Sequence, residues 1–343
     1  MNYLAAYLQM REGKELILAT KPYAKEIRSK SWYYTISSLL LLVGAIVGTY
    51  IAPGVWAKLA FSIFTAMMLS RFFIIFHDFQ HHTILYKSKA ANVIFTLFGA
   101  YMITPPSIWK RSHDHHHNHN AKLFSASIGS YPIMTKQKFL EASKKERFGY
   151  LAVRHPLNMF LSYFTMFLFG MCIQSFLSSP RRHWDSLVVV LLHVGFSVFL
   201  VVQFGWLTWF LSFFLPFFLS HMLGAYLFYA QHNFPGVVFK NNQEWNYAKA
   251  ALESSSYMVM NPVMQWVTAN IGFHHIHHLN SRIPFYRLPE AMREIPELQQ
   301  SKTTSLKPSD IIACLKLKVW DPSQNKMIGS NELKEEVNEK VAA

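Results

Sequence analysis

The sequence predicts an all-α integral membrane protein with four transmembrane helices in two hairpins. Hydrophobic residues make up 51% of the 343 residues and charged residues only 15%, whereas soluble domains carry about 25% charged residues. The apolar residues form long runs, and basic residues avoid two of the turns between them. Because a helix needs about 20 apolar residues to cross a bilayer, these runs are long enough to span it.

The elements follow from these runs. They lie at about 33–53, 55–76, 158–178, 186–203 and 206–229, with a shorter one at 91–104. The uncharged turn APGV joins the first two runs into hairpin 33–76, and QFG joins the last two into hairpin 186–229. The 91–104 run is too short to span and is expected to be re-entrant or interfacial.

Basic residues decide the expected orientation. They gather at 11–30, 110–154 and 180–183, and after Lys240, and the positive-inside rule places such stretches in the cytoplasm together with both termini. If 158–178 crossed the membrane, PRRH at 180–183 and every later histidine after Tyr229 would lie outside. We therefore expect 158–178 to lie in or dip into the membrane. The alternative is a five-span topology that splits the histidines across the bilayer.

We expect a single membrane domain over residues 1–343. Residues 1–32 form a cytoplasmic N-terminus, amphipathic at the membrane surface or else a solvated tail. Residues 77–185 carry two histidine clusters and interfacial helices. Residues 230–321 carry a third cluster in a cytoplasmic helical cap. Residues 322–343 are expected to form a flexible tail.

Charge and cysteine content exclude other classes. The net charge is +14, but no nucleic-acid-binding motif accompanies it, so anionic lipid or an acidic redox partner explains it better. Two cysteines, Cys172 and Cys314, exclude a disulfide-rich scaffold and fit a reducing compartment. The first 30 residues lack the arrangement of a signal peptide.

Histidines concentrate in three clusters, HDFQHH (77–82), SHDHHHNHN (112–120) and HHIHH (274–278). Residues three or four apart share a helix face. The histidines that share a face are His77 with His81, then the triplets His113, His116, His117 and His274, His277, His278. A distorted helix end could replace His81 with His82, and a lone His232 follows the last run. Such clusters predict metal binding.

The other histidines are expected to play lesser roles. We expect ordinary interfacial positions for His155, His183 and His193, and outer-shell or solvated positions for His115, His119 and His275. His221 lies inside a predicted span, where an ionisable group is a functional candidate, but a ligand role is not favoured.

The number of imidazoles points to two ions. A catalytic zinc takes three protein ligands, and about nine are available. Imidazole binds zinc, copper, iron and nickel, so ligand type leaves the metal open. The clusters contain no thiolate, no H-E-x-x-H and no E-x-x-H motif of carboxylate-bridged di-iron proteins. The pattern favours an all-histidine di-iron site, with Asp78 and Asp114 as carboxylates that could orient imidazoles.

The three clusters resemble the histidine boxes of membrane fatty acid desaturases. TANIGFHHIHHLNSRIPFYRLPEA (268–291) is similar especially to the acyl-lipid omega-6 (delta-12) type of bacteria and plastids, and YAQHNF (229–234) and CLKLKVWD (314–321) extend the likeness. It covers most of the chain, from about Phe76 to Asp321.

The resemblance implies two iron ions (Fe2+/Fe3+) that use O2 to remove two hydrogens from a membrane fatty acyl chain, leaving a cis double bond. The implied ligands are His77, His81 or His82, His113, His116, His117, His232, His274, His277 and His278, and no further catalytic side chain is expected. The spacing H-x-x-x-H picks His81, whereas the H-x-x-x-x-H of stearoyl-CoA desaturases picks His82. No HPGG haem-binding motif occurs, so a separate ferredoxin or cytochrome b5 type donor is implied.

Four further residues are candidates near the reaction. An apolar tunnel between the spans would position the acyl chain, and Trp109, Gln265 and Trp266 are candidate lining residues, with an interfacial aromatic belt as the alternative. Asn270 lies one turn before His274 and could bind an iron-bound water or a ligand imidazole.

Two other functions share some of these features. Lipid or alkane hydroxylases and carotenoid ketolases carry similar boxes but add oxygen to the substrate, and the NIGFHHIHH context favours a desaturase over them. A metal transporter would need ligands at mid-bilayer depth, where only His193 and His221 are expected.

Overall fold

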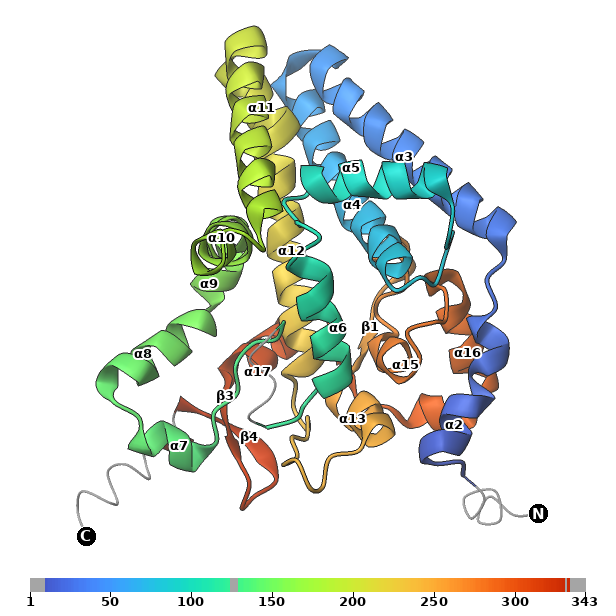
Figure 1. Cartoon of the computed structure of the whole chain (residues 1–343), viewed down its shortest axis with the longest axis vertical. Coiled ribbons are helices and arrows are strands. Elements are labelled where there is room, and N and C mark those ends of the chain that lie inside the picture. The colour runs from blue at the N-terminus through green and yellow to red at the C-terminus, as the bar shows by residue number, and fades with distance from the viewer. Residues whose placement is uncertain (1–9, 124–128, 331, 334–343) are drawn as a thin grey trace.

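The long helices gather at one end of the computed structural model and the short elements at the other (Figure 1). The structure describes residues 10–123, 129–330 and 332–333. Within them, three helices are long and apolar enough to cross a membrane. These helices position part of the histidine clusters, because two of the four histidine-bearing segments lie at the ends of long helices.

The first two long helices form the predicted hairpin. Helix α3 (Arg28–Ile51) and helix α4 (Gly54–Gln80) are separated by Ala52 and Pro53, both in extended conformation. Gly54 has a φ of 71°, which a glycine adopts without strain. The helices pack closely at Gly48, where a Cβ atom would overlap the ring of Phe61.

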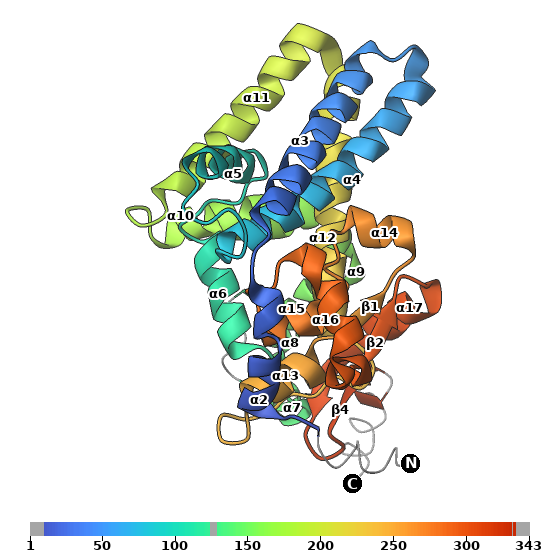
Figure 2. The same cartoon turned by 90° about the vertical axis from the view of Figure 1, so that its right-hand side faces the viewer.

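The third long helix differs from the prediction of two separate runs. Helix α11 (Trp184–Trp209), the π-helix η3 (Phe210–Phe214) and helix α12 (Leu215–His232) are continuous, so the described residues contain three long helices where four were predicted. Gly205 nevertheless has non-helical angles (φ 78°, ψ 166°), and the chain reverses at the upper end of α11 in Figure 2. The helices are continuous because a single residue, Gly205, makes the reversal and no separate loop is needed.

The far end of the long helices exposes large apolar side chains. Ile51, Trp56, Val202 and Trp206 are each at least 70% exposed. Contiguous apolar surface is unfavourable in water, and tryptophans are enriched where a membrane meets water. The long helices therefore have the surface of a membrane protein.

The shorter apolar runs do not form long helices. Helix α5 (Lys89–Tyr101) has 13 residues and lies across the hairpin (Figure 1). The run at 158–178 forms helix α9 (Pro156–Phe160), the π-helix η2 (Tyr163–Gln174) and helix α10 (Ser175–Ser178). The apolar part, Tyr163–Ser178, is shorter than the about 20 residues that a span needs.

The other end consists of short helices with recognisable caps. Ser143 and Glu146 form a capping box on α8, and Asn246 and Asn261 cap α13 and α14. These side chains satisfy amide groups that the first helical turn leaves free. The short helices are α2 (Gly13–Ala19), η1 (Lys21–Ala24), α6 (Trp109–His119), α7 (Lys136–Glu141), α8 (Lys144–Val153), α13 (Tyr247–Ser254), α14 (Pro262–Val267), α15 (His274–Leu279), η4 (Phe285–Arg287), α16 (Leu288–Glu294), η5 (Pro296–Gln300) and α17 (Pro308–Lys316).

Two small sheets correct the expectation of a purely helical chain. Strand β1 (Tyr257–Val259) pairs in parallel with β2 (Thr303–Ser305), and β3 (Leu317–Asp321) pairs antiparallel with β4 (Lys326–Gly329). Strand β4 lies in the segment 322–343 that was expected to be flexible. It is ordered because Ile328 is fully buried against a core that contains Val319. Residues 334–343 lie outside the described part.

The N-terminal segment contacts the short-helix end. Leu16 on α2 is buried in the main core, the Arg11 guanidinium pairs with Glu297 at 2.8 Å, and the Asn280 amide donates to Thr20 at 2.8 Å. Helix α2 thus packs beside α13. Residues 1–9 lie outside the described part.

Candidate metal centre

Nine imidazoles from four helices meet in two adjacent groups. The five-histidine group is His77, His81, His113, His117 and His277, and the four-histidine group is His116, His232, His274 and His278. Helix α4 and its C-cap supply two of the nine, α6 three, the end of α12 one and α15 three. Within each group, the nitrogen atoms lie within 4.8 Å of one another.

The five-histidine group brings Nε2 atoms into direct contact. The distance between the Nε2 atoms of His77 and His113 is 2.7 Å, and the Nε2 atoms of His81 and His117 lie 3.0 and 3.1 Å from that of His113. The Nε2 atom of His277 lies 3.1 Å from that of His117. The α4 segment and α6 thus each direct two ring nitrogens at a common point, and α15 directs one.

The four-histidine group has the same geometry. Its Nε2 atoms lie 3.0 Å apart between His116 and His232, 2.9 Å between His274 and His232, and 3.1 Å between His278 and His274. The rings of His117 and His278 stack with centroids 4.3 Å apart. Because these two rings belong to different groups, the two groups are immediate neighbours.

These contacts fit metal ligation better than hydrogen bonding. Each ring nitrogen has one proton or one lone pair, so the Nε2 atom of His113 cannot hydrogen-bond to three other Nε2 atoms at once. With a metal–nitrogen distance of about 2.1 Å, two ligands at a right angle lie about 3.0 Å apart. The observed spacings match this value. The donor set therefore fits two ions bound by imidazole.

Burial keeps most of these imidazoles neutral, as a metal ligand must be. Desolvation is the largest cause that lowers their pKa, and the neighbouring imidazoles lower it further. The pKa lies well below the ordinary value of 6.5 for His81, His113, His116, His117, His274, His277 and His278. A neutral ring leaves a lone pair on Nε2 when its proton is on Nδ1.

Among the described residues, two of the nine rings have a hydrogen-bond partner for Nδ1, and a third has a carboxylate nearby. The Nδ1 atom of His77 lies 3.4 Å from the carboxylate of Asp78, in contact but without a hydrogen bond. The Nδ1 atom of His116 lies 2.6 Å from the Ser130 hydroxyl, and that of His232 lies 3.1 Å from the Ser254 carbonyl oxygen. Such partners orient ligand rings. Ser130 and Ser254 carry no sequence signal that distinguishes them from other serines.

Of the two alternative histidines in the first cluster, the structure brings only His81 into a group. Helix α4 ends at Gln80, and His81 keeps a helical φ of −75° as its C-cap. His82 follows with a φ of 58°, is exposed and packs against Tyr86. The left-handed turn at the helix end rotates His82 away from the groups, so that the candidate ligand His82 is not brought into them.

Two outer-shell predictions do not fit the geometry. The carboxylate of Asp114 pairs with Lys110 at 2.8 Å on the outer side of α6, and its side chain is 45% exposed. The Asn270 amide donates to the Phe285 carbonyl oxygen at 3.0 Å, and no hydrogen bond joins it to an imidazole in the described part. Asn270 is linked to the five-histidine group through Phe285, whose amide donates to Asp78 at 2.7 Å.

Trp109 is the one proposed tunnel residue that lies at the metal centre. Its ring stacks on His113 with a centroid distance of 5.0 Å and meets Phe73 edge-on at 5.7 Å. The exposed Trp266 covers the guanidinium of Arg71 at 4.3 Å instead. The side-chain oxygen Oε1 of Gln265 is buried without a hydrogen-bond partner among the described residues.

An apolar cavity between α4 and α12 was not foreseen from the sequence. It measures about 40 Å³, and Phe73, Met102, Phe167 and Leu227 are among its lining residues. Trp109, Gln265 and Trp266 do not line it. The packing of segments that are distant in the sequence creates this cavity, so no local sequence pattern predicts it.

The remaining histidines lie outside the two groups. His193 contacts the Tyr163 hydroxyl at 2.6 Å, His183 contacts Ser107 at 2.8 Å, and His275 contacts the Leu298 carbonyl oxygen at 3.1 Å. His221 borders the apolar cavity, and the rings of His115 and His119 stack on each other at 4.0 Å.

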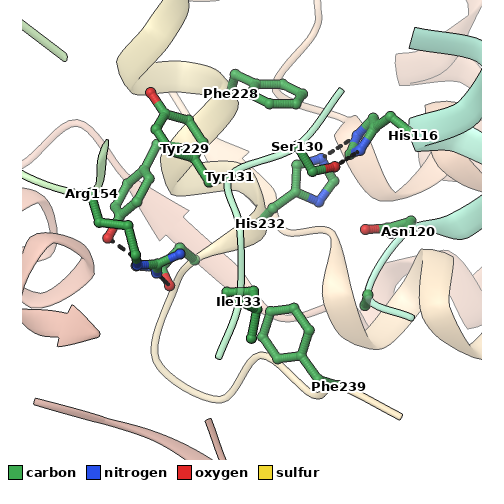
Figure 3. Close-up of a pocket in the computed structure, with 12 residues that line it drawn as sticks. His116, Asn120, Ser130, Tyr131, Ile133, Arg154, Phe228, Tyr229, His232 and Phe239 are labelled. Atoms are coloured by element: carbon green, nitrogen blue, oxygen red, sulfur yellow. Dashed lines mark hydrogen bonds between the residues drawn. The ribbon is translucent and has the colours of Figure 1, made fainter. Parts of the chain in front are cut away.

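A second cavity adjoins the four-histidine group. It measures about 30 Å³, and Figure 3 shows His116 and His232 on one side and Arg154 on the other. Ser130, Tyr131 and Ile133 border it from the segment that precedes α7. It gives the four-histidine group a small adjoining space, lined by both apolar and polar side chains, that none of the sequence patterns indicated.

Comparisons with known proteins agree with this picture. The family model described as fatty acid desaturase matches residues 53–306. A Bacillus subtilis protein named fatty acid desaturase is 28% identical over 277 residues, 80% of this chain and 78% of its own length. The sn-1 oleoyl-lipid 12-desaturase of Synechocystis is 26% identical, with 78% of this chain and 76% of its own length covered. The sn-1 acyl-lipid omega-3 desaturase (ferredoxin) of Nostoc is 24% identical, with 78% and 75% covered.

Proposed function

The chain belongs to the fatty acid desaturase family, whose members use O2 to desaturate fatty acyl chains, and we propose that its two histidine groups hold the iron for this reaction. It is an enzyme of fatty acid metabolism with the apolar helices of a membrane protein. In our proposal the product is a cis double bond in an acyl chain of a membrane lipid.

One observation carries the iron assignment: nine buried or half-buried imidazoles converge in two adjacent groups. In our proposal the five-histidine group and the four-histidine group hold one iron each. When bound, the two irons activate O2 so that hydrogen can be removed from an unactivated methylene. The chain's own residues keep the imidazoles neutral by burial and orient His77, His116 and His232 through their Nδ1 contacts.

The apolar cavity of about 40 Å³ is too small for a whole acyl chain, and it is the proposed place for the few methylene groups nearest the metal centre. It lies between α4 and α12, which lead directly to His77 and His232. Phe73 lines it and contacts Trp109, which stacks on His113. This aromatic pair would separate the acyl chain from water while it reaches the metal centre. The relatives named for lipid-linked acyl chains support a lipid substrate.

We propose four membrane crossings with both termini and the metal centre in the cytoplasm. The break at Gly205 would divide the third long helix into two crossings. Helices α6 and α15, which carry six of the nine imidazoles, lie at the end of the molecule away from the upper end of α11 (Figure 2). The basic segments at the imidazole end support a cytoplasmic location by the positive-inside rule.

A separate carrier would supply two electrons per turnover. The chain's net charge of +14 favours an acidic partner through electrostatic steering. The name of the Nostoc relative includes ferredoxin, which supports a ferredoxin-type donor for this chain over one of the cytochrome b5 type.

Expression in a host that lacks polyunsaturated lipids, with a donor supplied, tests the proposal. We expect new acyl chains that lack two hydrogens, with double-bond positions mapped by mass spectrometry, and two irons per purified chain. His277→Gln should abolish both results, whereas His275→Gln, two residues away and outside both groups, should retain them. Products that gain one oxygen would identify a hydroxylase, and protein without iron would refute the proposal.

A further inference from the structure

A buried arginine faces the cavity beside the four-histidine group. Arg154 is 0% exposed and caps the end of α8. Its guanidinium donates to the Pro132 carbonyl oxygen at 3.0 Å and to the Asn233 side-chain oxygen at 2.5 Å, while its Nε atom has no hydrogen-bond partner. Figure 3 shows it across the cavity from His116 and His232.

This guanidinium has no carboxylate to balance its charge. No ion pair joins Arg154 to an acidic side chain among the described residues. A second cation lies near, since the Lys318 ammonium donates to the Arg154 main-chain carbonyl oxygen at 3.4 Å. The partners that the guanidinium does have are uncharged, namely the hydrogen-bond acceptors and the rings of Tyr150 and Tyr229 at 5.6 and 5.2 Å, and a buried charge without an opposite charge is costly. The site therefore lacks a negative charge.

The proposed iron adds further positive charge to a site that already lacks negative charge. All four ligands of the four-histidine group are neutral imidazoles, so they cancel none of the ion's charge. In the described part, Asp78 is the one carboxylate within 4 Å of a cluster imidazole, and that imidazole is His77 of the other group. A divalent ion and Arg154 would thus share a buried region without an anion from the chain.

We propose that the cavity lined by His116, His232, Ser130 and Arg154 binds one small monovalent anion. The inference rests on the proposed iron content. The cavity of about 30 Å³ has room for roughly two water molecules, since one needs about 10–15 Å³. The anion is therefore of the size of formate or azide, and tetrahedral oxyanions such as sulfate are too large. It accepts a hydrogen bond from Arg154 and lies beside the four-histidine group.

Azide is the probe, because its infrared stretching band shifts when it binds to a protein. The iron-loaded, full-length protein in detergent should bind about one azide per chain, with formate as a competitor and sulfate without effect. Arg154→Gln should weaken azide binding by about 10- to 100-fold, as expected for the loss of a hydrogen bond from a charged group. Iron per chain is measured in every sample.

Two further variants make the result specific. Ile133→Phe fills the cavity without changing charge and should also weaken binding; it decides the question if Arg154→Gln does not fold. Arg71→Gln is the matched control, because Arg71 is a second buried arginine that donates to Ser38 at 2.9 Å and does not line this cavity. It should bind azide like the unaltered protein.

The outcomes separate the two proposals. A chain with two irons that binds no azide, or whose Arg154→Gln and Ile133→Phe variants bind azide normally, overturns the anion site and leaves the proposed function intact. An equal loss of binding in Arg71→Gln also overturns it. A chain that binds no iron overturns the proposed function and this inference with it.

Discussion

At the scale of residues, adjacent side chains in this protein have opposite roles. His81 contributes its Nε2 atom to the five-histidine group, whereas His82 turns out to the surface through a left-handed backbone conformation. His274 and His275 differ in the same way, because only His274 joins the four-histidine group. At a helix end, the rotation of the backbone from one residue to the next decides whether an imidazole can reach an ion.

Substitution of His81 and of His82 tests directly which of the two histidines binds iron. His81→Gln should lower the iron content and reduce desaturation by roughly two orders of magnitude or more, because even loss of an outer partner lowers affinity or activity about 10- to 100-fold. His82→Gln should retain both. Iron analysis and lipid profiling of the two variants check this, and equal losses would contradict the assignment.

The buried imidazole of His275 should make the free energy of unfolding depend on pH. Burial is the main cause that lowers its pKa from 6.5 to about 3. Between these values the unfolded chain takes up a proton that the folded chain does not. Its stabilising effect is therefore complete above pH 6.5 and decreases as the pH falls, by about 1.4 kcal/mol per pH unit.

Between pH 7 and pH 5, His275→Gln should therefore lose about 2 kcal/mol less stability than the unaltered chain. Denaturant unfolding of metal-free protein in detergent at the two pH values measures this difference. His155→Asn, at an exposed histidine, is the control that should change nothing. An unchanged pH dependence in His275→Gln would show that this ring titrates normally in the folded chain.

At the scale of elements, helix ends set the geometry of the metal centre. The end of α4, the end of α12 and the short helices α6 and α15 present the nine imidazoles. The long helices therefore act as rigid supports, and the reversal at Gly205 allows α12 to return to the side where α4 ends. Gly205 has angles (φ 78°, ψ 166°) that are almost exclusive to glycine.

Gly205→Ala should destabilise the protein by about 1–3 kcal/mol, the cost of holding a side-chain-bearing residue in this conformation. No atom lies within 4 Å of a Cβ built there, so the cost comes from the backbone alone. Thermal unfolding in detergent measures it. Gly195→Ala, in the helical part of α11 with equally open space, should be neutral or stabilising, and equal effects would refute the role of Gly205.

At the scale of the whole molecule, the protein separates an apolar end from a polar end. The exposed apolar side chains of α3 and α11 belong in lipid, whereas the histidine groups lie among short, capped helices. In the proposed function, an acyl chain enters from the lipid side while O2, protons and electrons arrive from water. This division requires that the two reversals lie on the side of the membrane opposite the metal centre.

Cysteine labelling tests this topology. In a chain with Cys172 and Cys314 replaced by alanine, a membrane-impermeant thiol reagent should label Pro53→Cys and Trp206→Cys on intact cells. Lys14→Cys and Asn118→Cys should be labelled only after permeabilisation. All four positions are exposed in the structure. Labelling of Asn118→Cys on intact cells would contradict a cytoplasmic metal centre.

The sequence by itself determined the chemistry of this protein and much of its local structure. The apolar runs, the H-x-x-H-H spacings and the boxes at 77–82, 113–117 and 274–278 follow from the periodicity of a helix, which is a local property. They were enough to predict a membrane protein with clustered imidazoles and to identify the family that the comparisons support.

Only the tertiary structure decided which imidazoles meet and what surrounds them. The choice of His81 over His82, the division into five and four, the Ser130 contact to His116 and the unbalanced Arg154 all depend on segments far apart in the sequence. The two cavities and the ion pair of Asp114 with Lys110 also became visible only in the tertiary structure. Residue spacing specifies a helix face, but the packing of helices determines what that face contacts.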